Sequence, residues 1–337
     1  MANGLLGMEF GSSRLKIAEV RDHKLVKFFA ADMPDNIIRN GEVVSMDGLS
    51  DFLKDVLKEQ KFTAKKVCLA VPDAETIIRR LQFPLMTEAQ LKVNLPFEFH
   101  DFITGEKDDY LFDYAMIGIE SDESGKDTGM DLLGVAVSKQ KMLDYQTMFR
   151  RIGLKLVEAA PVSLAIGCLL NRLVPESRNR DFAVLDLGYH SSDILMFSDG
   201  VYDTKRTYEI GCEAMAQRIA EQMNCDIHIA SLHLKQNTDG VLDSQAVSDI
   251  SGEIAVNVMR AVNYYTYEKR DNSLEVLYVT GGGAWIEPLV KQISDTVPLK
   301  VVLLSSLKNA AVSDEEALIS GSAACGICFY GERGADR

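Results

Sequence analysis

The chain repeats one short pattern at two places: a strand that ends in an acidic residue, any residue and glycine, followed by a second strand. The pattern occurs at Met8-Glu9-Phe10-Gly11 and again at Leu185-Asp186-Leu187-Gly188. In each copy, alternating apolar residues flank the glycine turn, which predicts a β-hairpin. Two hairpins of one kind predict two similar lobes that face each other across a cleft.

The segments between the hairpins predict a mixed α/β lobe with an insertion. We expect a third strand over 25–30, a helix over 49–57 and a strand over 67–71. The inserted α+β part is predicted to contain strands over 77–81, 114–119 and 131–137, helices over 88–101 and 139–151, and a polar hairpin loop over 120–127.

The second half predicts a similar lobe with a more helical end. A strand over 155–158 and a helix over 162–173 lead into the hairpin strands 182–188 and 192–197. Residues 213–270 are expected to be mostly helical, with one apolar face in the core. Strand 277–280 then runs into a glycine turn, and a helix of small residues follows at 321–324.

Composition excludes several classes of protein. A length of 337 residues suits two lobes, and 36 basic against 50 acidic residues give a net charge of −14. Such a surface disfavours nucleic acids and anionic membranes. The sequence contains no apolar run long enough for a membrane helix and begins without a basic signal region, so we expect a cytoplasmic protein without direct membrane insertion. The six cysteines, including the pair Cys325 and Cys328, are expected to be small buried residues rather than disulfides or zinc ligands.

The first hairpin turn offers groups that can hold phosphate. Gly11, Ser12 and Ser13 expose backbone N–H donors, and Lys16 lies on the returning strand, where its ammonium can reach the turn. A plain hairpin turn and a solvent-exposed strand lysine are the alternatives. Glu9 and Asp186, one from each hairpin, suit a cleft in which Mg²⁺ is held through water between carboxylates and phosphates. They are also the candidates for a catalytic residue, whose identity the sequence leaves open.

The turn Gly281-Gly282-Gly283 has no side chains to obstruct a flat adenine or ribose, although a simple strand-to-helix loop would have the same composition. The chain contains neither a Walker A motif nor a dinucleotide fingerprint.

The ordered set of these motifs resembles the actin-like ATPase superfamily and, within it, the PilM family of type IV pilus assembly proteins, which is related to FtsA. The likeness spans nearly the whole chain. The residues that carry it are Gly11 to Lys16, Leu95-Pro96-Phe97-Glu98 with Phe112-Asp113-Tyr114, Ile152-Gly153-Leu154, Tyr208 to Gly211, and Thr280 to Gly283.

The resemblance implies an α/β actin-like ATPase fold with two lobes, a nucleotide cleft between them and subdomains 1A, 1C, 2A and 2B. Carried onto this sequence, the limits are 1–83 and 153–180 for 1A, 84–152 for the inserted 1C, 181–213 and 273–331 for 2A, 214–272 for 2B, and 332–337 for a C-terminal tail.

The resemblance also implies ligands and partners. Gly11, Ser12, Ser13 and Lys16 would contact the β- and γ-phosphates of ATP, Asp186, Gly188 and Gly211 would belong to the second phosphate turn, and Gly281 to Gly283 would contact the adenosine, with Mg²⁺ in the cleft. The family's partner is the short cytoplasmic N-terminal segment of PilN, bound in a groove on 1A and 1C. The protein would thus lie at the inner face of the cytoplasmic membrane through a PilN-like protein, with other pilus assembly proteins as further partners.

The sequence departs from the family pattern around the nucleotide. Glu9 replaces an aspartate, Ala160 replaces a glutamate before Pro161, Tyr189 and His190 occupy a turn that is normally small, and Cys212 replaces a glycine. Lost acids and added bulk should depress phosphoryl transfer before they abolish binding. We therefore expect, at most, a slow ATPase that acts as a scaffold, with ATP and Mg²⁺ binding weakened or lost.

Two other functions remain open at this point. A small-molecule kinase on the same lobes needs an aspartate base in a substrate pocket, and no acid of this sequence has that context. An FtsA-like cell-division protein would carry a C-terminal amphipathic membrane helix, and the segment 326–337 has no such pattern.

Overall fold

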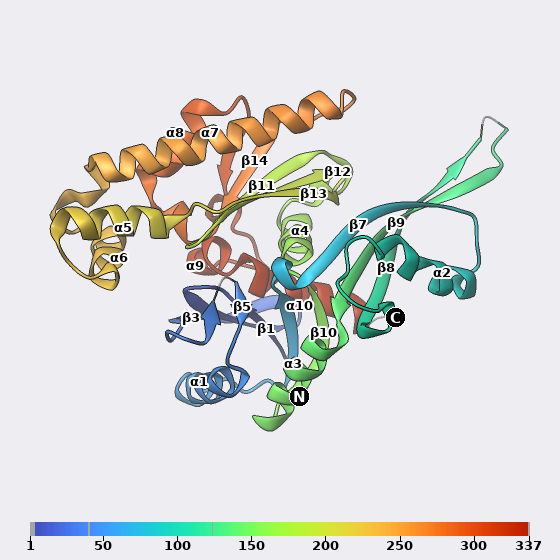
Figure 1. Ribbon diagram of the computed structural model, residues 1–337, viewed down its shortest axis with the longest axis horizontal. Coiled ribbons are helices and arrows are strands. Elements are labelled where there is room, and N and C mark those ends of the chain that lie inside the picture. The colour runs from blue at the N-terminus through green and yellow to red at the C-terminus, as the bar shows by residue number, and fades with distance from the viewer. Residues whose placement is uncertain (1–3, 40, 123, 336–337) are drawn as a thin grey trace.

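Two five-stranded sheets of the same design build the molecule (Figure 1). The computed structural model describes residues 4–39, 41–122 and 124–335. In each sheet, three antiparallel strands form a meander, and two further strands add in parallel beside its first strand. The first sheet contains β10 (Lys155–Pro161), β6 (Lys66–Val71), β1 (Leu5–Phe10), β2 (Arg14–Arg21) and β3 (Lys24–Asp32) in that order. The second contains β13 (Val201–Tyr208), β12 (Ser192–Ser198), β11 (Phe182–Leu187), β14 (Val276–Thr280) and β15 (Lys300–Leu303). The repeat predicted from the two hairpins is confirmed.

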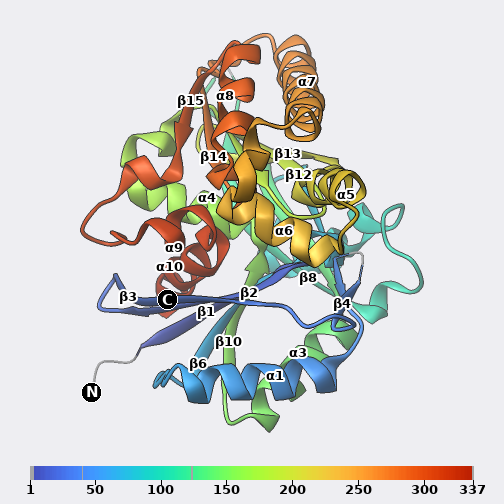
Figure 2. The ribbon, with the colours of Figure 1, turned by 90° about the vertical axis from the view of Figure 1, so that its left-hand side faces the viewer.

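Helices cover both faces of the first sheet (Figure 2). Those of this lobe are α1 (Met46–Glu59), α3 (Lys139–Arg151), α4 (Val162–Leu173) and α10 (Ser322–Ala335). Ser45 caps α1 by accepting from the Gly48 amide at 3.2 Å, and the helix buries Leu49 and Leu53 at helical spacing. Helices α1 and α3 lie on the outer face of the sheet, whereas α10 lies on the side that faces the second lobe.

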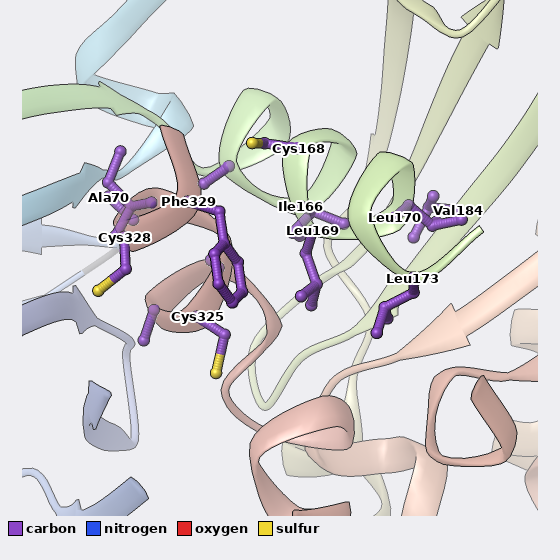
Figure 3. Packing of buried hydrophobic residues seen from close by; sticks show 14 of the residues in the cluster. Ala70, Ile166, Cys168, Leu169, Leu170, Leu173, Val184, Cys325, Cys328 and Phe329 are labelled. Carbon is purple, nitrogen blue, oxygen red and sulfur yellow. The ribbon is translucent and has the colours of Figure 1, made fainter. Parts of the chain in front are cut away.

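Helices α4 and α10 form a layer shared by the two lobes. Side chains of α4, such as Ile166 and Leu169, pack beside Cys325, Cys328 and Phe329 of α10 (Figure 3). The same apolar cluster includes residues of both sheets, namely Ala18, Val20, Cys68 and Ala70 of the first and Phe182, Val184, Leu195 and Phe197 of the second. Burial raises the pKa of the Cys328 thiol well above its usual value, so these cysteines are packing residues, as the sequence predicted.

A third sheet is inserted after β6. It orders β7 (Thr76–Pro84), β9 (Asp127–Ser138) and β8 (Tyr110–Ser121), and the β8–β9 hairpin extends away from the rest of the molecule (Figure 1). One face packs on α2 (Glu88–Asn94) and the 3₁₀ helix η2 (Leu95–Phe99). The single helix predicted over 88–101 is wrong in its second half, because Pro96 has no N–H to donate to the Lys92 carbonyl and the chain tightens into 3₁₀ geometry.

The second lobe carries the remaining helices. They are α5 (Cys212–Met223), α6 (Ile227–Gln236), α7 (Gln245–Glu268), α8 (Glu287–Thr296) and α9 (Glu315–Ile319). The helical character expected for 213–270 is confirmed, and Ile254, Val258 and Val262 of α7 are buried as predicted. The sequence pattern does not predict β13 or β15.

Short elements complete the chain. They are β4 (Ile38–Arg39), β5 (Glu42–Val43) and the 3₁₀ helices η1 (Asp73–Glu75), η3 (Lys107–Asp109), η4 (Pro175–Asn179), η5 (Thr238–Asp243), η6 (Gly282–Trp285) and η7 (Leu304–Leu307). The subdomain limits stay a prediction, and residues 336–337 of the expected tail lie outside the described part. No helix in the described ranges is long and apolar enough to span a membrane.

Candidate functional site

The two predicted hairpins place their acidic residues at equivalent positions. Glu9 on β1 pairs with Lys16 on β2, and Asp186 on β11 pairs with Asp193 on β12. The Lys16 ammonium donates to the Glu9 carboxylate, and both side chains are largely buried. Lys16 is therefore held by a neighbour within its own hairpin rather than being a free strand lysine.

The acids of the two lobes lie near one another. Burial raises the pKa of Asp186 to about 7; Lys16 opposes this shift, whereas Glu9 and Asp193 add to it. Glu9 and Lys16 belong to the first hairpin, so charges of that hairpin act on the Asp186 carboxyl of the second. That the two hairpin acids share one cleft stays a prediction.

The first turn is a compact hairpin tip. The Gly11 amide donates to the Arg14 carbonyl at 3.0 Å, and the Met33 amide donates to the Ser13 carbonyl at 2.9 Å. A Cβ at Gly11 would lie 3.1 Å from the Lys16 ammonium nitrogen, so this glycine lets the lysine fold back over the turn. Ser12 is exposed and Ser13 half-buried.

The second turn is anchored to the start of α5. The amides of Cys212 and Glu213 donate to the carbonyls of Gly188 and Tyr189 at 3.2 and 2.8 Å. His190 also contacts the Glu213 carboxylate at 2.8 Å. Two N–H donors of this helix N-terminus are therefore already used by the turn, and they are not available for a phosphate.

Gly211 and Tyr189 allow the second turn to pack against the start of α5 and against α6. A Cβ at Gly211 would lie 2.7 Å from the Gly188 carbonyl oxygen, so the close approach of the turn needs a glycine there. The Tyr189 hydroxyl lies 3.4 Å from the Ser231 hydroxyl on α6, which points this bulky side chain toward the helices of the second lobe. Burial raises the pKa of the Cys212 thiol to about 12, so Cys212 is a neutral packing residue.

The glycine turn after β14 packs against the second hairpin. Gly281 has a positive φ of 88°, and its amide donates to the Ile319 carbonyl at 2.7 Å. A Cβ at Gly283 would lie 2.8 Å from the Leu187 Cβ, whereas one at Gly282 would meet nothing within 4 Å. Gly281 and Gly283 are needed for packing, and Gly282 alone has open space beside it.

Sequence reasoning missed three further polar residues at this site. Asp73 follows β6, Ser163 lies in the first turn of α4, and Lys205 lies on β13. The Lys205 ammonium lies 3.2 Å from Asp73 and 3.7 Å from Asp193. The one signal available was the position of Asp73 just after a parallel strand, where functional side chains commonly gather.

Three of the carboxylates near the hairpin tips already contact a lysine. Mg²⁺ usually keeps several waters and is held by one or two carboxylates together with phosphates. Glu9 is paired with Lys16, and both Asp73 and Asp193 lie within ion-pair distance of Lys205. Across the residues that the structure describes, no group of three or more His, Cys, Asp or Glu side chains is placed to hold a metal. The water-mediated contact predicted for Glu9 and Asp186 stays a prediction.

A groove lies between the inserted sheet and the first lobe. This groove has a volume of about 440 Å³. One wall is formed by Leu111 to Ala115 of β8 and by alternate residues of β9, and the other by Ala159 to Pro161 of β10 with α4. Tyr202 of β13 contributes from the second lobe. Ala160 is 5% exposed and lines this groove.

Comparisons with known proteins agree with this architecture. A family model described as type IV pilus assembly protein PilM matches residues 7–324. A solved PilM-PilN type IV pilus biogenesis complex has a TM-score of 0.81 at 23% identity, covering 97% of this chain and 98% of that one. The ethanolamine utilization protein EutJ from Carboxydothermus hydrogenoformans gives 0.60 at 13% identity, with 96% and 89% covered. An archaeal actin homolog gives 0.52 at 10% identity, with 98% and 99% covered. The expected actin-like ATPase fold is confirmed.

Proposed function

The chain belongs to the PilM family of type IV pilus assembly proteins, and from that premise we propose that it is an actin-like scaffold that recruits the N-terminal cytoplasmic segment of a PilN-like membrane protein. The observation that carries the proposal is the groove between the inserted sheet and the first lobe. Through this partner the protein would be held at the inner face of the cytoplasmic membrane, where further pilus assembly proteins can join it.

The shape of the groove suits an extended peptide. Five consecutive residues of β8, Leu111 to Ala115, line it, whereas β9 contributes only Leu133, Val135 and Val137. Consecutive residues are lined up in this way when the edge of a strand, rather than one face, borders a cavity. In the described sheet β8 pairs only with β9, so its outer edge is free to add a peptide strand through main-chain hydrogen bonds.

The chemistry of the groove selects apolar side chains. Its apolar lining includes Leu133, Val135 and Leu164, and the aromatic residues Phe197 and Tyr202 of the second lobe also line it. Asp113 is the acidic residue of the lining and is exposed on β8. A segment with apolar anchors and a polar or basic residue facing Asp113 would satisfy both parts of the wall.

We place ATP in the cleft as a weak ligand with little or no turnover. Support comes from the two hairpin tips and from Gly282, where an added Cβ would meet no atom within 4 Å. Against tight binding stand the Lys16–Glu9 pair and the two α5 amides that the Tyr189 turn already occupies. Since charge stabilisation carries most of phosphoryl transfer, we expect phosphate release well below about one per second.

The test is titration with a peptide of about ten residues from the N-terminus of a PilN-like protein of the same genome. We expect binding below about 100 μM, and a loss of at least about tenfold on Ala115→Trp, because the ring would fill the groove from an exposed position. Met116→Trp is the matched control: Met116 is 51% exposed on the same strand and does not line the groove. Failure of the wild-type chain to bind, or equal affinity for both tryptophan variants, would overturn the proposal.

A further inference from the structure

Asp73 is the point where three parts of the molecule meet. It lies in η1, between β6 of the first sheet and β7 of the inserted sheet. Its side chain contacts Ser163 of α4 within the first lobe and Lys205 of the second lobe. These contacts join residues that are 90 and 132 positions apart in the chain.

Asp73 caps α4 from outside the helix. The Ser163 amide donates to Asp73 Oδ1 at 3.2 Å, and the Ser163 hydroxyl donates to Oδ2. Pro161 occupies the N-cap position of α4 and has no side-chain acceptor for the first amides. The start of α4 therefore depends on a carboxylate supplied by η1.

Lys205 ties the second lobe to this cap. Its ammonium lies 3.2 Å from Asp73 Oδ2 and 3.7 Å from Asp193 Oδ1, and the Thr207 hydroxyl also donates to Asp193. Burial lowers the pKa of Lys205, but Asp73, Asp193 and Asp186 together raise it above its usual value, so the charged form is held by the surrounding acids. The ammonium provides a positive charge among the acids of the cleft.

A second ion pair on β13 fixes the same strand against the inserted sheet. Asp203 lies 3.7 Å from Arg80 of β7 and 2.5 Å from Lys269. Asp203 and Lys205 are two positions apart on β13 and carry opposite charges. Asp203 pairs with Arg80, and Lys205 pairs with Asp73. This arrangement favours one register of β13 against η1 and β7, because a shift of two residues would place like charges together.

The junction lies between the acids of the hairpin tips and the groove. On one side, the Lys205 ammonium lies 3.7 Å from Asp193, and the charge of Asp186 also acts on it. On the other side, α4 lines the groove with Leu164 and Gly167, and β13 lines it with Tyr202. We propose that Lys205 couples the cleft to the groove: paired with Asp73 it holds α4 and β13 in the arrangement that forms the groove, and an anion in the cleft draws its ammonium away. The coupling to a peptide rests on the function proposed above, whereas the clamp itself does not.

Hydrogen exchange tests the clamp in the absence of peptide. We expect Lys205→Gln and Asp73→Asn each to speed exchange of β13 and of the first turn of α4 by about fivefold or more, in both lobes at once. Lys291→Gln, which changes an exposed lysine of α8 in the same lobe, is the matched control and should leave both segments unchanged. Unchanged exchange in the two clamp variants would overturn the proposal.

Peptide titration with ATP as the anionic probe tests the coupling. We expect Lys205→Gln to bind the peptide about three- to tenfold more weakly, ATP at millimolar concentration to weaken wild-type binding, and the variant not to respond to ATP. An equal response to ATP in the wild type and in Lys205→Gln would refute the coupling. If the wild-type chain binds no peptide while the exchange data follow the expectation, the proposed function fails and the clamp stands.

Discussion

At the scale of single residues, the two hairpins use equivalent positions differently. Glu9 faces Lys16 across its hairpin, while Asp186 faces another acid, Asp193. The sequence predicts a shared cleft for Glu9 and Asp186, because both end the first strand of a repeated pattern, and this stays a prediction. It could not predict that Lys205 would pair with Asp73 and Asp193, since β13 has several charged residues and a single buried residue, Tyr202, in place of an apolar face.

The raised pKa of Asp186 makes stability depend on pH. The folded-state value of about 7 lies above the usual 3.8, so this residue favours folding below pH 4 and loses that contribution as the pH rises through 7. We expect Asp186→Asn to reduce the loss of unfolding free energy between pH 5 and 8 by more than about 1 kcal/mol, measured by urea denaturation. Asp271→Asn, at an exposed carboxylate, is the control. Parallel pH profiles for wild type and Asp186→Asn would contradict the assignment.

Replacing Ala160 by glutamate, the residue that the family resemblance implies at this position, should not restore ATP hydrolysis. Its side chain is 5% exposed among apolar groups, so a carboxylate there would lose water without gaining a partner. We expect Ala160→Glu to lower the unfolding free energy by about 2 kcal/mol or more and to bring no phosphate release. Ala115→Glu, on the exposed opposite wall, should stay within about 0.5 kcal/mol of wild type. A stable Ala160→Glu variant that hydrolyses ATP would contradict this expectation.

At the scale of elements, strong periodicity predicted most helices and strands, and local chemistry decided the exceptions. Helix α3 runs over Lys139–Arg151, as the sequence predicted. Pro96 divides the helix expected over 88–101, and β15 has only four residues, too few to show a period. The placement of α10 between the lobes was not predictable, because it depends on glycine contacts distant in sequence.

Helix α10 approaches its neighbours through glycines. A Cβ at Gly326 would lie 1.9 Å from the Ala165 carbonyl oxygen of α4, which requires the two helices to separate. We expect Gly326→Ala to lower the unfolding free energy by about 3 kcal/mol in urea denaturation. Gly252→Ala is the matched control, since it lies within α7 with nothing within 4 Å, and it should raise stability by about 0.5–1 kcal/mol. Equal effects of the two substitutions would mean that α10 does not pack as closely as this.

At the scale of the whole molecule, the two-lobe plan follows from a sequence repeat, but the contacts that set the lobes against each other do not. A repeated hairpin pattern is local, so a single sequence is enough to detect it. The tie between Asp73 and Lys205 spans 132 positions and joins residues that look like ordinary surface charges. The sequence does not predict the groove either, because its walls come from the inserted sheet, the first lobe and β13.

The same interlobe charges set the response of the whole molecule to nucleotide. A ligand stabilises the folded state by RT ln(1 + [L]/Kd), so 1 mM ATP at a Kd of about 1 mM adds only about 0.4 kcal/mol. For a chain of this length we expect a rise in Tm below about 2 °C, measured by differential scanning fluorimetry. Because Lys16 and Lys205 already neutralise the cleft acids, Mg²⁺ should add little to that rise. Lys16→Ala should abolish it, whereas Lys291→Gln should leave it intact. A rise above about 5 °C that requires Mg²⁺ would show instead that the carboxylates exchange their lysine partners for the metal when nucleotide binds.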